Sequence, residues 1–386
     1  MAKQTAEFDI IVYGASGFTG RLVAEYLANQ GIQKWAMAGR SLSKLTQVRD
    51  EMGLPSDTPL VIADASTPAT LIDMCKRTRV VLTTVGPYQL YGPELVAACA
   101  ETGTDYVDLC GEPAWMRQMI DAHDARAKET GARIVFSCGF DSIPFDLGVW
   151  FLQKEANQRH GKPAPRVKGR VRKMQGGASG GTIASLTETM KAAAKNPKII
   201  GILKSSFGLT PGFEGPAQPS GLMPEYDSAT GTWTAPFVMA PINTKNVHRS
   251  NFLLGHPYGR DFVYDEMMMT TIGDAGRAMA EAIAKANPFG DAKILPGDGP
   301  SKEERENGFY DVLFIGEYPD GTSLRVSVSG DKDPGYGSTS KMISESALTL
   351  LETDTPGGVT TPGAVMAARL LARLEKNAGL TFLVEG

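Results

Sequence analysis

Three evenly spaced glycines near the start of the chain are its best candidate for a ligand-binding turn. Gly14, Gly17 and Gly20 follow a short apolar run at residues 10–13 and precede a helical pattern of apolar residues. Glycine tolerates positive φ, and a helix N-terminus presents free N–H groups that suit a pyrophosphate. The pattern predicts a dinucleotide-binding turn, although a strand–helix turn without a ligand has the same outline. The pyrophosphate would lie over four consecutive residues of this turn: Ser16, Gly17, Phe18 and Thr19.

The loop after the second predicted strand, residues 34–38, bears on the type of cofactor. A site for NAD usually has an acidic residue there, which binds the ribose 2′-hydroxyl. This chain has Arg40 and Ser41 instead, and its next acidic residue is Asp50. A guanidinium beside the ribose pairs well with a 2′-phosphate. We therefore expect NADP(H) rather than NAD(H), with the alternative that Arg40 is a solvated loop residue.

The loops after the third and fourth predicted strands carry further candidate contacts, because ligands of open α/β sheets bind beyond the carboxyl ends of the strands. Asp64 either binds the adenine amino group or opens the next helix. Val85, Gly86 and Pro87 form a tight turn that lets a nicotinamide lie close to the backbone, with Tyr88 beside it. An ordinary Gly-Pro turn is the alternative reading.

Acidic side chains follow the fifth and sixth predicted strands. Asp108 and Glu112 flank a short loop, and Glu112 has the alternative role of opening the next helix. Asp141 comes after the sixth strand, and Ser142 next to it is a plausible helix cap. We expect Asp141 to lie at the same sheet edge as the cofactor loops.

The elements that must position these residues alternate regularly over the first 140 residues. Short apolar runs separated by helical patterns predict an α/β fold with a doubly wound, parallel Rossmann sheet. The predicted strands are 8–13, 34–38, 59–63, 80–85, 105–109 and 133–137. The predicted helices are 18–30, 41–52, 67–77, 92–102 and 114–130.

The second half of the chain has a different pattern. A strand is predicted at 166–175, then a glycine-rich turn at 176–182 that is either an anion site or a plain turn, then a helix at 183–194. Residues 208–242 contain six prolines and predict long loops over a substrate region. Strands at 311–317 and 323–329 form a hairpin around Pro319-Asp-Gly. This half therefore predicts an α+β domain with a mostly antiparallel sheet.

Helices are predicted at 341–352 and 363–376. We assign residues 1–145 to the NADP-binding domain and 146–356 to the second, substrate domain. The C-terminal helical segment 357–386 is expected to pack back on the first domain.

Composition excludes several functional classes. The 386 residues carry a net charge of −4 without a basic block, which argues against nucleic-acid binding as the main role. The four cysteines form no C-x-x-C pair and no metal-ligand spacing, so we expect reduced thiols and no metal. No signal peptide and no run of 18 apolar residues stand out. We therefore expect a cytoplasmic protein, with peripheral contact at the inner face of the plasma membrane and a homodimer left open.

Taken together, these motifs resemble the saccharopine dehydrogenase-like oxidoreductase family over nearly the whole chain. In the first half the matching stretches are 13–21 (YGASGFTGR), 38–42 (AGRSL), 84–93 (TVGPYQLYGP), 106–113 (YVDLCGEP) and 139–149 (GFDSIPFDLGV). In the second half they are 179–183 (SGGTI), 330–343 (GDKDPGYGSTSKMI) and 357–363 (GGVTTPG).

Within that family the chain is most similar to the trans-acting enoyl reductases of actinobacterial lipid biosynthesis. The resemblance implies NADPH-dependent reduction of an α,β-unsaturated acyl thioester, delivered by the carrier protein of a polyketide synthase. Tyr88 or Asp141 would then supply a proton, and Tyr336 and Lys341 would line the substrate pocket. Two alternatives are another NADP-linked reductase, acting on an imine, amino acid or ketone, and a non-catalytic cofactor-binding lipid or scaffold protein.

An acyl thioester requires a long apolar pocket, whereas an amino acid requires converging arginines. The candidate apolar lining is Phe207, Phe213, Phe237, Met239, Phe252 and Leu253. Arg249 and Arg260 are the only arginines in the window 207–270, which favours the thioester.

Overall fold

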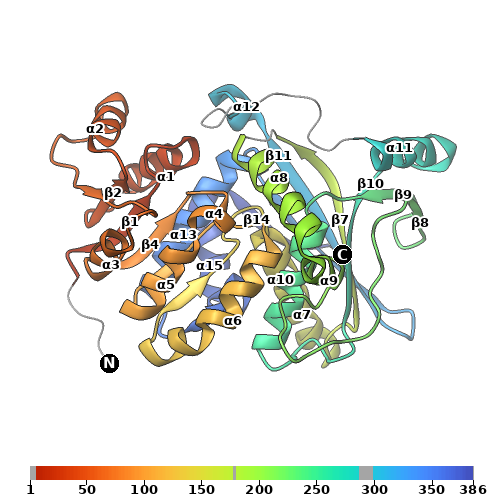
Figure 1. Ribbon diagram of the computed structural model, residues 1–386. Helices are drawn as coiled ribbons and strands as arrows, with labels where there is room; N and C mark the ends of the chain where they lie inside the picture. Colours follow the sequence, from red (N-terminus) through yellow and green to blue (C-terminus); the bar gives the residue numbers. More distant parts are fainter. Residues whose placement is uncertain (1–5, 177–179, 287–298, 386) are drawn as a thin grey trace.

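The computed structural model describes residues 6–176, 180–286 and 299–385, which form two seven-stranded sheets (Figure 1). Every strand pair of the first sheet is parallel. The strands lie in the order β13 (Gly358–Thr360), β6 (Arg133–Val135), β5 (Asp105–Val107), β4 (Thr78–Thr83), β1 (Phe8–Tyr13), β2 (Trp35–Gly39) and β3 (Leu60–Ile62). The predicted Rossmann sheet is thus confirmed, and β13 adds a strand from the far end of the chain.

Helices cover both faces of this sheet, and alternate residues of β1 enter different cores. Ile10 and Val12 belong to the core beneath α1 (Phe18–Asn29), α2 (Leu42–Glu51) and α13 (Thr339–Leu351). Ile11 belongs to the core beneath α3 (Pro68–Lys76), α5 (Pro93–Thr102) and α6 (Pro113–Thr130). Because β1 is buried on both sides, its sequence is a continuous apolar run rather than an alternating one.

The second sheet is mostly antiparallel, as predicted, and β7 with β10 is its parallel pair. Its strands lie in the order β14 (Leu380–Glu385), β12 (Ser323–Gly330), β11 (Phe309–Glu317), β7 (Arg166–Gln175), β10 (Val263–Met269), β9 (Thr232–Pro236) and β8 (Glu225–Asp227). Helix α7 (Ile143–His160) packs against β11 and β12. Phe145 of this helix meets Phe314 of β11 with ring centroids 6.3 Å apart.

The remaining elements are short or connect the two sheets. They are α4 (Tyr88–Tyr91), α8 (Gly180–Lys195), α9 (Pro197–Lys204), α10 (Ala240–Leu253), α11 (Gly273–Lys285), α12 (Lys302–Asn307), η1 (Pro334–Ser338), α14 (Pro362–Val365), α15 (Ala367–Arg373) and η2 (Leu374–Ala378). Figure 1 places α8 and α9 in front of α10, between the two halves of the molecule.

Two predictions for the second half were wrong. The segment 208–242 is not all loop, because it contains β8, β9 and the start of α10. The predicted helix 363–376 breaks at Met366 into α14 and α15, and a strand, β14, follows it. The sequence did not predict helix α10, because seven of its polar or charged residues are buried and the helix therefore lacks an apolar stripe.

The C-terminal segment returns to both sheets rather than to the first alone. β13 pairs with β6 of the first sheet, whereas β14 pairs with β12 of the second. Helix α13, which the predicted boundaries place in the second domain, packs against α1 and β4. The boundaries at 145 and 356 therefore stay predictions. Three residues of the predicted glycine-rich turn, 177–179, lie outside the described residues.

Within the described part of the chain, no helix combines the length and the apolarity needed to cross a membrane. The four cysteines are free and buried, and the Sγ atoms of Cys75 and Cys99 lie 3.6 Å apart.

Candidate active site

The glycine turn after β1 has the geometry that a dinucleotide requires. Gly14 has φ +91°, and a Cβ there would lie 2.6 Å from the side chain of Val85. A Cβ on Gly20 would lie 2.1 Å from the carbonyl oxygen of Gly14, so only glycine lets α1 approach the strand this closely. Gly17 caps α1 without a side-chain hydrogen bond, which leaves the first amide groups of the helix free for a diphosphate. These residues fit NADP(H).

The residues predicted for the adenosine end lie at the carboxyl ends of β2 and β3. Arg40 is exposed and makes no ion pair with any described residue. Ser41 caps α2, since its hydroxyl accepts a 3.3 Å hydrogen bond from the amide of Lys44. Asp64 accepts hydrogen bonds from the amide and hydroxyl of Ser66, at 2.9 and 2.8 Å. These bonds, with a smaller effect of Arg40, lower the pKa of Asp64. Asp64 therefore organises the turn before α3, whose cap residue is Thr67, and its contact with adenine stays a prediction.

A buried carboxylate holds the turn predicted for the nicotinamide. The Gly86–Pro87 peptide is cis, and the amides of Tyr88 and Gln89 donate to Glu112 at 2.8 and 2.9 Å. Glu112 is also the residue before α6, so it does open that helix. Sequence reasoning missed its second role, since nothing in the spacing shows that the loops after β4 and β5 touch.

Tyr88 is buried beneath this turn. Its hydroxyl donates to the carbonyl of Thr83 at 3.3 Å and accepts from the amide of Leu109 at 3.1 Å. Burial raises the pKa of Tyr88 well above its ordinary value. Its ring packs on Trp115, with centroids 5.7 Å apart. This geometry favours a packing role, and proton donation by Tyr88 stays a prediction.

Asp141 lies in the loop after β6, beside the loop after β5. A Cβ on Gly111 would be 3.4 Å from its Oδ2 atom. Its carboxyl group has no hydrogen bond or ion pair with any described residue, and burial raises its pKa to about 7. A carboxyl group with that pKa is about half protonated at neutral pH, as a general acid requires.

Asp108 resembles Asp141 in its pKa but not in its contacts. Burial raises the pKa of Asp108 to about 7. However, its carboxylate accepts from the amides of Cys110 and Ser137 and from the hydroxyl of Tyr106, each at 2.8 or 2.9 Å. Asp108 therefore joins the loops after β5 and β6, whereas Asp141 keeps an unused carboxyl group.

The two residues predicted to line the substrate pocket lie on elements that touch the cofactor half. The ring of Tyr336, in η1, meets the ring of Phe18 edge-on at 5.2 Å. Lys341 lies half-buried near the start of α13, the helix that packs against α1 and β4. Their role toward substrate stays a prediction.

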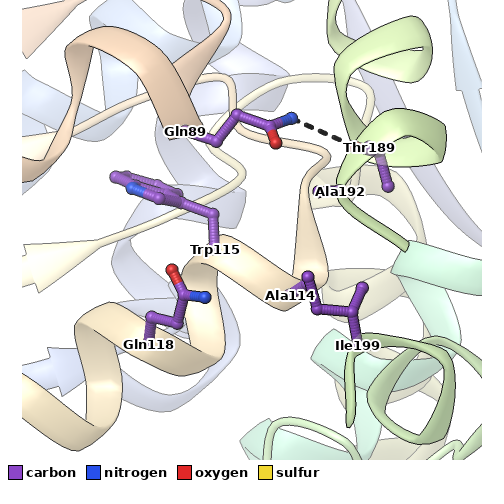
Figure 2. A pocket seen from close by; sticks show the side chains of 7 residues that line it. All are labelled: Gln89, Ala114, Trp115, Gln118, Thr189, Ala192 and Ile199. Atoms are coloured by element: carbon purple, nitrogen blue, oxygen red, sulfur yellow. Dashed lines mark hydrogen bonds between the residues drawn. The ribbon is translucent and has the colours of Figure 1, made fainter. Parts of the chain in front are cut away.

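Two cavities follow one another along α6 and α9. The first is small, at about 40 Å³, and beside it the side-chain amide of Gln89 donates to Thr189 at 3.3 Å (Figure 2). Its lining is Gln89, Ala114, Trp115, Gln118, Thr189, Ala192 and Ile199. The second is an open groove of about 410 Å³. Its lining is Arg117, Gly201, Ile202, Ser205, Phe207, Gly208, Thr210, Gly212, Phe213 and Glu214.

Only two residues of the predicted apolar lining, Phe207 and Phe213, line one of these cavities. Phe207 and Phe213 line the groove, whereas Phe237 is buried against Phe145 with ring centroids 5.5 Å apart. Phe252 lies behind Phe213, at 6.2 Å between centroids.

The two arginines of this region lie in different surroundings, Arg249 buried and Arg260 exposed. Arg249 is buried and donates to the carbonyls of Leu209 and Val359, at 2.5 and 2.6 Å. The guanidinium of Arg260 lies over the ring of Phe213, 4.9 Å from its centroid. They do not converge on a site for a substrate carboxylate.

Comparison with known proteins identifies the family of this chain. Residues 10–135 match the saccharopine dehydrogenase NADP binding domain. A Mycobacterium tuberculosis protein named for trans-acting enoyl reduction is 41% identical, and the trans-acting enoyl reductase of Mycobacterium ulcerans is 39% identical. Each match covers 97% of both chains.

Among solved structures, saccharopine dehydrogenase from Saccharomyces cerevisiae has a TM-score of 0.53 at 13% identity, over 98% of this chain and 100% of that one. This likeness concerns the fold alone. The sequence matches decide the assignment: the chain belongs to the saccharopine dehydrogenase-like family, in the group of the trans-acting enoyl reductases, and is an NADP(H)-dependent oxidoreductase.

Proposed function

We propose that this protein reduces the carbon–carbon double bond of an α,β-unsaturated acyl thioester with NADPH, and that Asp141 supplies the proton. The names of its relatives support the reaction class. The observation that carries the proposal is the unused carboxyl group of Asp141, whose pKa is raised to about 7 at the sheet edge where the cofactor loops end.

Most of the residues named above would bind the cofactor, and Asp141 would transfer the proton. Bound NADPH supplies a hydride, which would add to the β-carbon of the enoyl group. The turn at 14–20 would hold the diphosphate, and Arg40 the 2′-phosphate. Glu112 fixes the turn at 86–88 on which the nicotinamide would rest. Protonated Asp141 would give its proton to the α-carbon, which completes addition of two hydrogens across the double bond.

The surroundings suit a neutral, apolar substrate better than an amino acid. A thioester carries no carboxylate, so it needs no pair of converging arginines, and here Arg249 is buried on main-chain carbonyls whereas Arg260 is exposed over the ring of Phe213. Phe207 and Phe213 give the groove an apolar wall for an acyl chain. The thioester would be delivered by a polyketide synthase carrier protein, in line with the name of the relatives.

A turnover assay tests this proposal. The purified protein is mixed with NADPH and with enoyl thioesters of pantetheine or of a carrier protein, and loss of absorbance at 340 nm is followed. We expect turnover by the wild type, a loss of about 100-fold or more in Asp141→Asn, and no change in the exposed control Asp57→Asn. NADPH binding without enoyl turnover, or turnover of imines or keto acids instead, would contradict the proposal.

A further inference from the structure

The glycine turn itself carries no charge with which to meet a diphosphate. Residues 14–20 contain no basic side chain, so the turn offers only amide groups and the partial charge of α1. The nearest basic residue in sequence, Arg21, is paired with Glu51 at 3.0 Å. A diphosphate has two negative charges in this position, and a cation brought from elsewhere in the fold would bind it more strongly.

The second half of the chain places an arginine at this turn. Arg305 lies on α12, and its guanidinium carbon is 5.4 Å from the centroid of the Phe18 ring. Phe18 is the first residue of α1, directly after the helix cap. Arg305 therefore lies against the side chain of the first residue of α1. Figure 1 shows α12 on the same side of the molecule as the glycine turn.

The guanidinium of Arg305 has hydrogen-bonding capacity left. Its Nη1 atom donates to the carbonyl of Pro300 at 2.6 Å, whereas Nε and Nη2 make no hydrogen bond with the residues that the structure describes. It forms no ion pair within the same part of the chain. The nearby acidic residue Asp333 uses its carboxylate to accept from the amides of Tyr336 and Gly337.

We propose that Arg305 is a ligand of the cofactor diphosphate, contributed to the glycine turn from the second half of the chain. Arg40 then binds the 2′-phosphate and Arg305 binds the diphosphate, so replacing each arginine should change the affinity for a different part of the cofactor. The inference rests on the assignment of NADP(H) as cofactor and not on the proposed substrate. The competing role for Arg305 is packing on Phe18 alone, which would leave dinucleotide affinity unchanged.

Calorimetric titration with three ligands separates these roles. NADPH and NADH both carry a diphosphate, whereas 2′-AMP carries only the 2′-phosphate. For Arg305→Gln we expect affinity for NADPH and for NADH to fall by the same factor, about tenfold, while affinity for 2′-AMP is unchanged. Arg305→Lys should recover part of the loss, since a charge without the planar fork remains.

A matched control is Arg277→Gln, because the Arg277 guanidinium also lies over an aromatic ring, that of Trp233 at 5.6 Å, but on α11. It should leave all three affinities unchanged. Dinucleotide affinities of Arg305→Gln within twofold of wild type, or an equal loss of 2′-AMP affinity, would overturn the inference. A wild type that binds 2′-AMP but neither dinucleotide would overturn the cofactor assignment together with it.

Discussion

The hydroxyl of Tyr26 donates a 2.7 Å hydrogen bond to the carboxylate of Glu345, which is fully buried. The bond joins α1, the helix that follows the glycine turn, to α13, which lies 319 residues later in the chain. Arg373 donates to the other carboxylate oxygen at 2.7 Å. One buried charge thus fixes the cofactor helix to the C-terminal part of the chain.

Replacing Tyr26 with phenylalanine should therefore destabilise the protein. The variant keeps the ring but leaves one oxygen of Glu345 without its donor, so the free energy of unfolding should fall by about 1–3 kcal/mol. Urea denaturation measures the change. Tyr226→Phe is the control, since Tyr226 is 57% exposed and should give no change. Equal stability of both variants would contradict the assigned role of the bond.

Because α1 lies so close to β1, alanine at Gly20 should destabilise the protein far more than alanine at Gly201. Gly20→Ala places a methyl group 2.1 Å from the Gly14 carbonyl oxygen, so the strand and helix must separate. We expect a loss of about 3 kcal/mol or more in unfolding free energy, with loss of NADPH binding. Gly201→Ala, in helix α9 with nothing within 4 Å, should be neutral or slightly stabilising. Thermal unfolding of the two variants decides the matter.

Arg40→Gln should abolish the preference for NADPH over NADH. Arg40 is exposed and unpaired among the described residues, so its loss removes a charge from the proposed 2′-phosphate site without disturbing the fold. Affinity for NADPH should fall by about 10- to 100-fold, and affinity for NADH should stay the same. Fluorescence titration with both dinucleotides measures the ratio. A ratio unchanged from wild type would move the 2′-phosphate site elsewhere.

The pKa of Asp141 predicts a pH dependence with a definite sign. If the protonated carboxyl group is the proton donor, kcat should fall as pH rises through about 7, and Asp141→Asn should lack this limb. A pH–rate profile of both proteins is the measurement. A wild-type rate that is flat from pH 6 to pH 8 would remove Asp141 from the reaction.

The same group also affects stability. Its folded-state pKa of about 7 lies above the ordinary 3.8, so its contribution to stability is complete below about pH 4 and is lost as pH rises through 7. Asp141→Asn should therefore be more stable than wild type at pH 8, by on the order of 1–2 kcal/mol, and the gain should vanish at pH 4. Denaturation at both pH values checks this, with Asp57→Asn as the control that should show no gain at either.

The first half of the fold was predictable because its signals are local. Each strand of the parallel sheet is a short apolar run, and each following helix has an apolar face, so β1 to β6 fall within a few residues of their predicted positions. The glycine turn was also predictable, because the spacing of its glycines between a strand and a helix is typical of such turns. The structure gives the reasons: Gly14 has positive φ, and Gly20 lies against the Gly14 carbonyl oxygen.

What could not be predicted depends on contacts between distant segments. Helix α10 buries Asn243, Lys245 and Arg249, each of which donates to a group outside this helix, and Lys245 also to the carbonyl of Pro241 within it. Its sequence therefore looked like a polar loop. The role of Glu112 needed the loops after β4 and β5 side by side, and that of Arg305 needed α12 over α1. Nothing in the sequence near residues 112 or 305 points to these neighbours.

The placement of β13 and β14 has a consequence for how the protein is made. Both strands complete sheet edges, one beside β6 and one beside β12, and both are encoded after residue 357. Most of the chain therefore leaves the ribosome before β13 and β14 are made, while the main-chain groups at the edges of β6 and β12 still lack these neighbours. Open edges of this kind attract other strands. The nascent protein thus stays open to faulty association at both edges until β13 and β14 have been made, and chaperones that shield strand edges would help it most before then.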